Sequence, residues 1–305
     1  MNVHSVNISV IVCTFNREKY IINTLEHLLK QKKVNSHDYE VIIINNNSTD
    51  NTEKICVSFI KENKLSNFHY FNEDKQGHTF ARNRGIAESK GMIISFLDDD
   101  AFVTENYIFH IFSFFNQHPK ASAIGGKIEP FYESSKPSWM SKYLLPLVAA
   151  LDLGNEIMIF PKNKFPIGAN MAFRKIVFDN YGDFNVNLGR RGTSLEGGDE
   201  KELFIRLRRG KELIYYVPQV KVMHVIPDSR TKNDYIKNMA IGVGTSEKKR
   251  LRKSHLNIKF NRLIQEVLKI FGTSVLFIFY SFKGRFKAAF MLVKFRIWVI
   301  NGFLK

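Results

Sequence analysis

Three consecutive aspartates, Asp98, Asp99 and Asp100, follow directly on the apolar run "GMIISFL" of residues 91–97. Adjacent carboxylates repel one another, so they require solvent or a cation at this point of the chain. Carboxylates after a strand are typical ligands of Mg²⁺ or Mn²⁺, which bind proteins through a few such groups together with substrate phosphates. A solvated turn whose aspartates cap the following helix would look the same. The run alone therefore leaves a metal site and a capped turn both open.

A second acidic pair, Asp199 and Glu200, follows two glycines in "GGDEKELFIRLRRG" (197–210). A carboxylate is a common general base, and the flanking glycines allow a substrate to approach closely. The pair also stands where the dipole of the predicted helix would stabilise acids without any catalytic role. Both interpretations can hold together, because a base in this position would stay ionised.

Short apolar strands alternate with amphipathic helices before and between these residues. The pattern predicts strands over 7–15, 39–46, 67–71 and 91–97, with helices over 17–31, 48–63 and 79–90. Such alternation is typical of an α/β fold with a mostly parallel sheet and helices on both faces. Ligands of these sheets bind at the carboxyl ends of the strands, which is where the three aspartates stand.

The pattern loosens after residue 130. Five prolines punctuate 130–170, which we interpret as a loop-rich region that forms the pocket of a second substrate. Residues 199–210 predict a short helix with a glycine stop, and 212–226 predict two short strands broken at Pro218.

Composition excludes several classes of protein. The 305 residues are 44% hydrophobic and 24% charged, which excludes wholesale disorder. Two cysteines form no disulfide framework and favour a reducing compartment. The N-terminal stretch lacks the features of an export signal and is expected to be a first strand.

The net charge of +16 is concentrated near the C-terminus. Residues 246–305 carry 14 Lys or Arg and two acids, whereas the first 245 residues carry 31 basic and 27 acidic residues. A nucleic-acid-binding module is one alternative for such a tail. Against it, the aromatic residues there lie in long apolar runs, so no nucleic-acid partner is expected.

Seven segments occur in an order that resembles one known family. They are "VIVCTFNR", "VIIINNNSTDNT", "KQGHTFARNRGI", "ISFLDDDAF", "PIGANMAFRK", "LEGGDEKELFIRLRRG" and "VKVMHVI". Together they resemble the family 2 glycosyltransferases of the GT-A fold over most of residues 7–235. The resemblance implies a Rossmann-like sheet with a donor-binding half (1–130) and an acceptor-binding and catalytic-base half (131–245). The concentration of basic residues marks 246–305 as a separate, amphipathic helical C-terminal segment.

The resemblance also implies a donor site. It assigns Thr14, Phe15 and Arg17 to the loop that meets the nucleotide base and phosphates, and it makes Arg82 of "ARN" face the donor. Arg82 could instead be a helix-surface arginine paired with a nearby acid. Asn45 stands where many members have an aspartate that accepts a proton from uracil. An Asn carbonyl can still accept that bond, so a UDP-sugar stays favoured among nucleoside-diphosphate sugars, although less strongly.

The implied metal site holds Mn²⁺ or Mg²⁺ and consists of Asp98 and Asp100, the ends of a DxD motif, with Asp99 on the sugar or ribose. His224 resembles the histidine that completes this site in some members, although a lone strand histidine is often structural.

The resemblance places the catalytic base at Glu200 or Asp199. Members usually have Glu-Asp with the base three positions before a leucine. Counting back from Leu203 gives Glu200, but the order of the two acids is inverted here, so both remain candidates. Trp139 and Asn170 are the predicted acceptor-binding residues.

The C-terminal segment has apolar stretches at 270–282 and 290–304 beside the basic run of 246–255. Neither stretch reaches the roughly 20 apolar residues that a membrane-spanning helix requires. Basic, aromatic helices of this kind favour a peripheral position on an anionic membrane, here the cytoplasmic face. Packing of these helices on the catalytic core is the alternative.

The resulting prediction is a metal-dependent, inverting glycosyltransferase that uses a saccharide or lipid-linked saccharide as acceptor in polysaccharide or glycolipid assembly. A nucleotidyltransferase for sugar nucleotides or lipid phosphates is a second enzymatic alternative. It would ordinarily carry a glycine-rich loop after the first strand, and "CTFNRE" is not glycine-rich.

Overall fold

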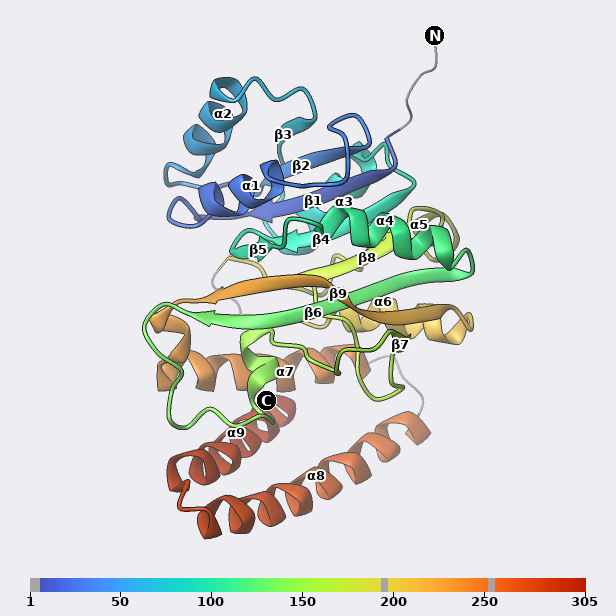
Figure 1. Cartoon of the computed structure of the whole chain (residues 1–305). Coiled ribbons are helices and arrows are strands. Elements are labelled where there is room, and N and C mark those ends of the chain that lie inside the picture. Colours follow the sequence, from blue (N-terminus) through green and yellow to red (C-terminus); the bar gives the residue numbers. More distant parts are fainter. Residues whose placement is uncertain (1–5, 193–196, 252–255) are drawn as a thin grey trace. The chain divides into compact units, whose positions relative to one another are not determined.

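The computed structural model describes residues 6–192, 197–251 and 256–305, without the side chains of 256–259, 261 and 263 (Figure 1). Leu195, Glu196, Arg252 and Lys253 of the segments quoted above lie outside this part of the chain. The chain forms two compact units. Unit 1 consists of Met1–Phe131, Ala149–Asn187 and Asp199–Val225, and unit 2 consists of Tyr132–Val148, Leu188–Gly198 and Ile226–Lys305. The three functional segments drawn from the sequence stay a prediction.

A mixed sheet forms the centre of unit 1, with its strands in the order β3-β2-β1-β4-β8-β6-β9-β5 and with β7 beside β9. The strands are β1 (Ile8–Thr14), β2 (Tyr39–Asn45), β3 (Phe68–Asn72), β4 (Ile93–Asp98), β5 (Ala101–Val103), β6 (Ala121–Tyr132), β7 (Met158–Ile159), β8 (Asn170–Arg174) and β9 (Leu213–Ile226). The β3-β2-β1-β4 half is parallel, as the sequence predicted. The pairs β4–β8, β6–β8, β5–β9 and β7–β9 are antiparallel.

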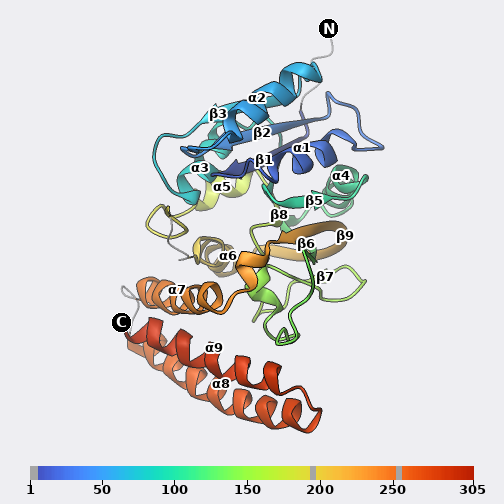
Figure 2. The ribbon, with the colours of Figure 1, turned by 90° about the vertical axis from the view of Figure 1, so that its left-hand side faces the viewer.

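Helices connect and cover these strands. They are α1 (Ile21–Leu29), α2 (Thr52–Glu62), α3 (His78–Glu88), α4 (Tyr107–Gln117), α5 (Ile176–Tyr181) and α6 (Asp199–Arg209). Figure 2 shows α1 and α4 on one side of the central strands and α3 and α5 on the other. A Cβ at Gly85 of α3 would lie 2.5 Å from the Ile11 side chain, so the glycine lets this helix approach β1. Because both faces are covered, β1, β2 and β4 are apolar along almost their whole length.

One predicted element is wrong. Residues 213–226 form a single strand, β9, and not two strands broken at Pro218. On the edge opposite β6, β9 pairs with β7 at Tyr215 and Tyr216 and with β5 at 222–224. Pro218 falls between the residues of these two pairings, so it interrupts neither of them and the strand continues past it.

Unit 2 is helical. It contains the 3₁₀ turns η1 (Leu145–Val148) and η2 (Asp228–Thr231) and the helices α7 (Asn233–Leu251), α8 (Leu256–Phe282) and α9 (Phe286–Leu304). Helices α7 and α9 meet backbone to backbone, since a Cβ at Gly302 would lie 2.1 Å from the Ile241 carbonyl oxygen. By length and composition, Ile264–Phe282 of α8 could cross a membrane. This span adds to the 270–282 stretch the six residues 264–269, which include two charges.

Candidate active site

Two aspartates and a histidine form a compact group at the end of β4. Asp98 ends β4, Asp100 precedes β5, and β5 pairs with β9 so that Ala101 lies opposite His224. The potential ligand atoms of these three residues all lie within 4.8 Å of one another. His224 Nε2 is 2.9 Å from Asp100 Oδ1 and 3.6 Å from Asp98 Oδ2. Two carboxylates and an imidazole fit Mn²⁺ or Mg²⁺ as a donor set, and the nitrogen ligand suits Mn²⁺ better.

The group is buried on one side and open on the other. His224 and Asp100 are 2% and 1% exposed, whereas the Asp98 side chain is 31% exposed. The Val225 N–H donates to the Asp100 carbonyl at 2.8 Å, which holds the aspartate segment against β9. Substrate oxygens can therefore reach the group from the Asp98 side.

Asp99 does not belong to this group. Its carboxylate accepts a hydrogen bond from Arg17 Nε at 3.1 Å, and Arg17 Nη2 lies 3.6 Å from Asp100. Burial raises the pKa of Asp99 to about 6, with Arg17 opposing the shift and the neighbouring aspartates adding to it. The structure thus brings the predicted phosphate-binding arginine to the aspartate run.

The other predicted donor residues lie at the same edge of the sheet. Thr14 and Asn45 are register partners at the ends of β1 and β2, and Cys13 of β1 is the register partner of Asp98. Phe15 follows β1 and is half-buried. The Asn45 amide donates to Asn72 Oδ1 at 3.1 Å, and its carbonyl accepts from the Ser48 N–H at 3.2 Å. These two hydrogen bonds fix the orientation of the Asn45 side chain.

Arg82 binds the second acidic pair. It is 1% exposed, so it is not a helix-surface arginine, although it does pair with acids. Nη1 lies 2.5 Å from Asp199 Oδ2, and Nη2 donates to Glu200 Oε1 at 3.1 Å. The guanidinium also lies 5.8 Å and 5.2 Å from the ring centroids of Phe96 and Phe184. Two acids and two rings thus hold this arginine in one position.

The two acids differ in exposure and in proton affinity. The Asp199 side chain is 3% exposed and that of Glu200 is 25% exposed. Burial, then the charge of Glu200, raises the pKa of Asp199 to about 7 against the opposing effect of Arg82. For Glu200 the effect of burial is outweighed by Arg82 and by the hydrogen bond with Asp199, which lower its pKa to about 2. Of the two acids, Asp199 therefore has the higher proton affinity, and Glu200 is the one that ionises more readily and that solvent reaches.

Gly168 is a site residue to which sequence reasoning gave no role. A Cβ at this position would lie 2.1 Å from Arg82 Nη2 and 2.3 Å from Glu200 Oε1. The glycine leaves the space in which the arginine and the glutamate meet. It occurs in the quoted segment "PIGANMAFRK", but its role depends on which side chains fold against it.

The two predicted acceptor-binding residues belong to different units. Asn170 is fully buried, donates to the carbonyls of Lys127 and Val220 and accepts from the Tyr107 hydroxyl. Its amide therefore links β6, β8 and β9. Trp139 is half-buried in unit 2. The acceptor-binding role of the two residues stays a prediction.

Curated proteins related to this chain are glycosyltransferases. Residues 9–182 match the family model for glycosyl transferase family 2. The chain is 26% identical over 235 residues to the glucosyl-dolichyl phosphate glucuronosyltransferase of Haloferax volcanii, which covers 75% of this chain and 72% of that protein. It is 39% identical over 102 residues to glycosyltransferase GlyG of Streptococcus pneumoniae, which covers 33% of this chain and 32% of GlyG. Against the minor teichoic acid biosynthesis protein GgaB of Bacillus subtilis it is 31% identical over 120 residues, 39% of this chain and 13% of GgaB.

Solved structures of glycosyltransferases share the fold. The mannosyltransferase PcManGT from Pyrobaculum calidifontis, in complex with GDP-Man and Mn²⁺, superimposes with a TM-score of 0.68 at 14% identity over 98% of this chain and 86% of that one. TarS 1–349 of S. aureus, in complex with UDP, gives a TM-score of 0.54 at 19% identity over 78% and 65% of the two chains. At these identities the likeness concerns the fold alone. Since the family match covers more than half of the residues, this chain belongs to glycosyl transferase family 2 and has the GT-A fold that its sequence predicted.

Proposed function

We propose that this glycosyltransferase moves a sugar from a nucleoside-diphosphate sugar to a hydroxyl group of a saccharide or lipid-linked saccharide, with inversion at the anomeric carbon. One observation carries the proposal. Unit 1 contains both the potential metal ligands Asp98, Asp100 and His224 and a pair of acids, Asp199 and Glu200, whose pKa values differ. Burial raises the pKa of the Cys13 thiol near the end of β1, and the charges of Asp98 and Asp199 both add to this shift. The two groups therefore serve one reaction centre.

Asp98, Asp100 and His224 would hold a divalent cation, with Mn²⁺ favoured over Mg²⁺. When bound, such an ion neutralises the charge that grows on the leaving diphosphate. Arg17 carries a second positive charge to the same edge, with Asp99 orienting its guanidinium. The carbonyl of Asn45 retains a second lone pair for a base N–H, so the proposal keeps a UDP-sugar as the favoured donor.

Glu200 is the group that we assign as catalytic base. In a single displacement, the acceptor oxygen forms a bond to the anomeric carbon, the bond to the diphosphate breaks, and the hydroxyl proton passes to a carboxylate. That carboxylate must be ionised and accessible, and Glu200 meets both conditions. Asp199 is buried against Arg82, so we assign it a positioning role.

The proposed class of acceptor rests on the names of related proteins and on the charge of the C-terminal segment. Two relatives are named for dolichyl phosphate glycans and one for teichoic acid biosynthesis. The basic segment 246–305 favours a place beside an anionic membrane. We therefore propose a peripheral enzyme at the cytoplasmic face, with a lipid-linked saccharide as acceptor in polysaccharide or glycolipid assembly.

Thermal stabilisation by nucleotides tests the donor site directly, since a ligand that binds only the folded state raises its stability. UDP, GDP, dTDP and CMP are each compared with Mn²⁺ and with EDTA. We expect a Mn²⁺-dependent rise in melting temperature with one nucleoside diphosphate, lost in Asp100→Ala. No rise with any of the four nucleotides would contradict the donor-site assignment.

A further inference from the structure

Helix α8 turns its apolar side outward. Between Ile264 and Phe282 nine large apolar residues of α8 are exposed, and eight of them share one side: Ile264, Val267, Leu268, Phe271, Val275, Ile278, Phe279 and Phe282. At about 100° per residue these eight positions fall within an arc of about 120°, so they form one continuous row along five turns, whereas the ninth, Ile270, lies about 120° from the centre of that arc. We call them the α8 row. Phe271 and Phe282 are its most exposed members, at 71% and 90%.

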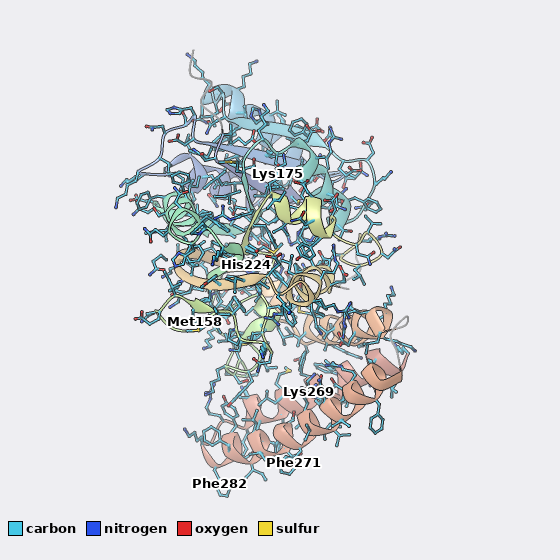
Figure 3. All side chains as sticks on the ribbon, turned by 90° about the vertical axis from the view of Figure 1, so that its right-hand side faces the viewer. Met158, Lys175, His224, Lys269, Phe271 and Phe282 are labelled. Atoms are coloured by element: carbon cyan, nitrogen blue, oxygen red, sulfur yellow. The ribbon has the colours of Figure 1, made fainter. Side chains whose placement is uncertain are left out.

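The polar side of the same helix faces inward. Glu266 is 7% exposed and pairs with Arg262 at 2.6 Å, with Lys269 at 2.8 Å and with Arg296 of α9 at 3.1 Å. Glu266 lies about 160° from the centre of the α8 row around the helix axis. In Figure 3, Phe271 and Phe282 lie along the outer edge of the helices, away from Lys269. These ion pairs fix the rotation of α8, so the row cannot turn inward without breaking a buried charge cluster.

The turn after the row adds aromatic and basic groups. Residues 282–287, "FKGRFK", are all exposed and alternate aromatic with basic side chains around Gly284. Lys283 Nζ lies 4.4 Å from the centroid of the Phe279 ring, and the Arg285 guanidinium lies 5.1 Å from that of Tyr280. Aromatic rings beside lysines and arginines are typical of groups at a lipid headgroup boundary.

The surface charge of this segment is positive. Of the 16 ionisable Lys, Arg, Asp and Glu residues in 246–305, the only acids are Glu247 and Glu266. Both are buried, and they pair with Arg250 and with the cluster around Arg262. Within the part that the structure describes, every exposed formal side-chain charge of this segment is therefore positive. A surface that is apolar and cationic is complementary to an anionic lipid leaflet.

We propose that the α8 row, together with the 282–287 turn, is a membrane-binding surface that lies in the plane of an anionic leaflet. A helix that crosses a membrane is apolar all round, whereas α8 carries charges on one side and pairs them with α9. This inference rests on the proposed membrane location and specifies which residues make the contact and in which orientation.

Vesicle binding by the full chain tests the surface. The probes are vesicles of pure phosphatidylcholine and vesicles that contain about a third phosphatidylglycerol. We expect binding to the anionic vesicles alone, reduced at least about tenfold by Phe271→Glu. Gln265→Glu adds the same charge to an exposed position of α8 outside the row and should change binding less than about twofold. Equal vesicle binding by Phe271→Glu and the parent chain would overturn the proposal.

Two further results would also overturn it. One is equal binding to both kinds of vesicle. The other is a lipid-free dimer that Phe271→Glu converts to a monomer, since the row would then be covered by a second copy. Phe282→Ser repeats the test without adding a charge. Because both side chains are exposed, neither variant should lower the melting temperature.

Depth measurements separate an in-plane helix from a spanning one. Single cysteines at Ile264, Val275 and Phe282 carry an environment-sensitive dye that shallow or deep spin-labelled lipids quench. The outer positions are about 27 Å apart along the axis, close to the thickness of the hydrocarbon core. Equal, shallow quenching at all three is expected. Deep quenching at Val275 with shallow quenching at both ends would show a spanning helix and overturn the orientation.

These measurements need neither donor nor acceptor. A chain that binds anionic vesicles through the α8 row but shows no nucleotide-induced stabilisation would contradict the proposed function and leave the surface intact. Nucleotide-induced stabilisation without binding to anionic vesicles would contradict the membrane-binding surface and leave the proposed function intact.

Discussion

Arg82 Nη1 lies 2.5 Å from Asp199 Oδ2, a contact between α3 and the first residue of α6 that joins positions 117 apart in the chain. The same guanidinium donates to Glu200, so one buried cation serves two adjacent carboxylates. Its positive charge favours ionisation of the pair, and Glu200 is the acid that ionises first. The contact therefore orients the two acids and influences their protonation.

The pH dependence of the reaction should follow the acid pair. Since the pKa of Asp199 is raised to about 7, the doubly ionised pair forms as pH rises through about 7. We expect kcat/KM to rise through this pH to a plateau, because loss of the Asp199 proton removes the hydrogen bond that lowers the pKa of Glu200 and so makes Glu200 a stronger base. In Asp199→Asn the neighbouring charge is gone while Arg82 still lowers the pKa of Glu200, so the acid limb should move below about pH 5. A pH–rate profile of both enzymes measures this.

The same pair of variants distinguishes base from positioning residue. Glu200→Gln should lower kcat by about 10² to 10⁴, and Asp199→Asn by about tenfold, with nucleotide-induced stabilisation kept in both. A larger loss for Asp199→Asn than for Glu200→Gln would assign the base to Asp199, and a limb that stays near pH 7 in Asp199→Asn would show that Asp199 is not the group that titrates there.

Removal of the buried arginine should destabilise unit 1. Arg82→Met leaves the buried Asp199 and the partly exposed Glu200 without their cation and should lower the free energy of unfolding by about 3 kcal/mol or more. Arg84→Met on the same helix removes a partly exposed pair with Glu88, a hydrogen bond to the Asn72 carbonyl and a contact with the Phe71 ring, and it should cost about 1 kcal/mol or less. Urea unfolding measures the free energy of unfolding of both variants. Equal losses would show that the buried ion pairs of Arg82 stabilise the protein no more than a partly exposed pair does.

Metal binding should depend on the two ends of the aspartate run and not on its middle. Asp100→Asn and His224→Gln should each weaken Mn²⁺ binding at least about tenfold, because each removes one donor of the group of three. Asp99→Asn is the matched control, since its carboxylate binds Arg17, and it should change the Mn²⁺ affinity less than about threefold. Titration calorimetry with Mn²⁺ gives the affinities. A loss of Mn²⁺ affinity in Asp99→Asn as large as in Asp100→Asn would contradict the assignment of Asp99 to Arg17 and not to the metal.

The helical unit should be sensitive to a single methyl group where α7 and α9 meet. Gly302→Ala places a Cβ 2.1 Å from the Ile241 carbonyl oxygen and should destabilise the protein by about 1–3 kcal/mol. At Gly272 of α8 no atom lies within 4 Å of an added Cβ, so Gly272→Ala should stabilise it by about 0.5–1 kcal/mol. Thermal unfolding checks both signs, and a neutral Gly302→Ala would show that the helices can separate at low cost.

The sequence by itself determined the parallel half of the sheet, its helices and the edge at which the donor residues gather. These features depend on the spacing of hydrophobic residues and on residues that are close together in the sequence, such as the aspartates at the end of β4. The helical nature of the C-terminal segment was also predictable, because amphipathic runs need no distant partner to be recognised.

Only the tertiary structure decided which distant side chains meet. The pairing of β5 with β9 brings His224 to Asp100, and the packing of α3 against α6 buries Arg82 between two acids. The fold alone makes Asp199 buried and Glu200 accessible, although the two are adjacent in sequence. It likewise turns the apolar side of α8 outward. Such outcomes depend on strand register and on the rotation of packed helices, which long-range contacts set and which the local pattern does not contain.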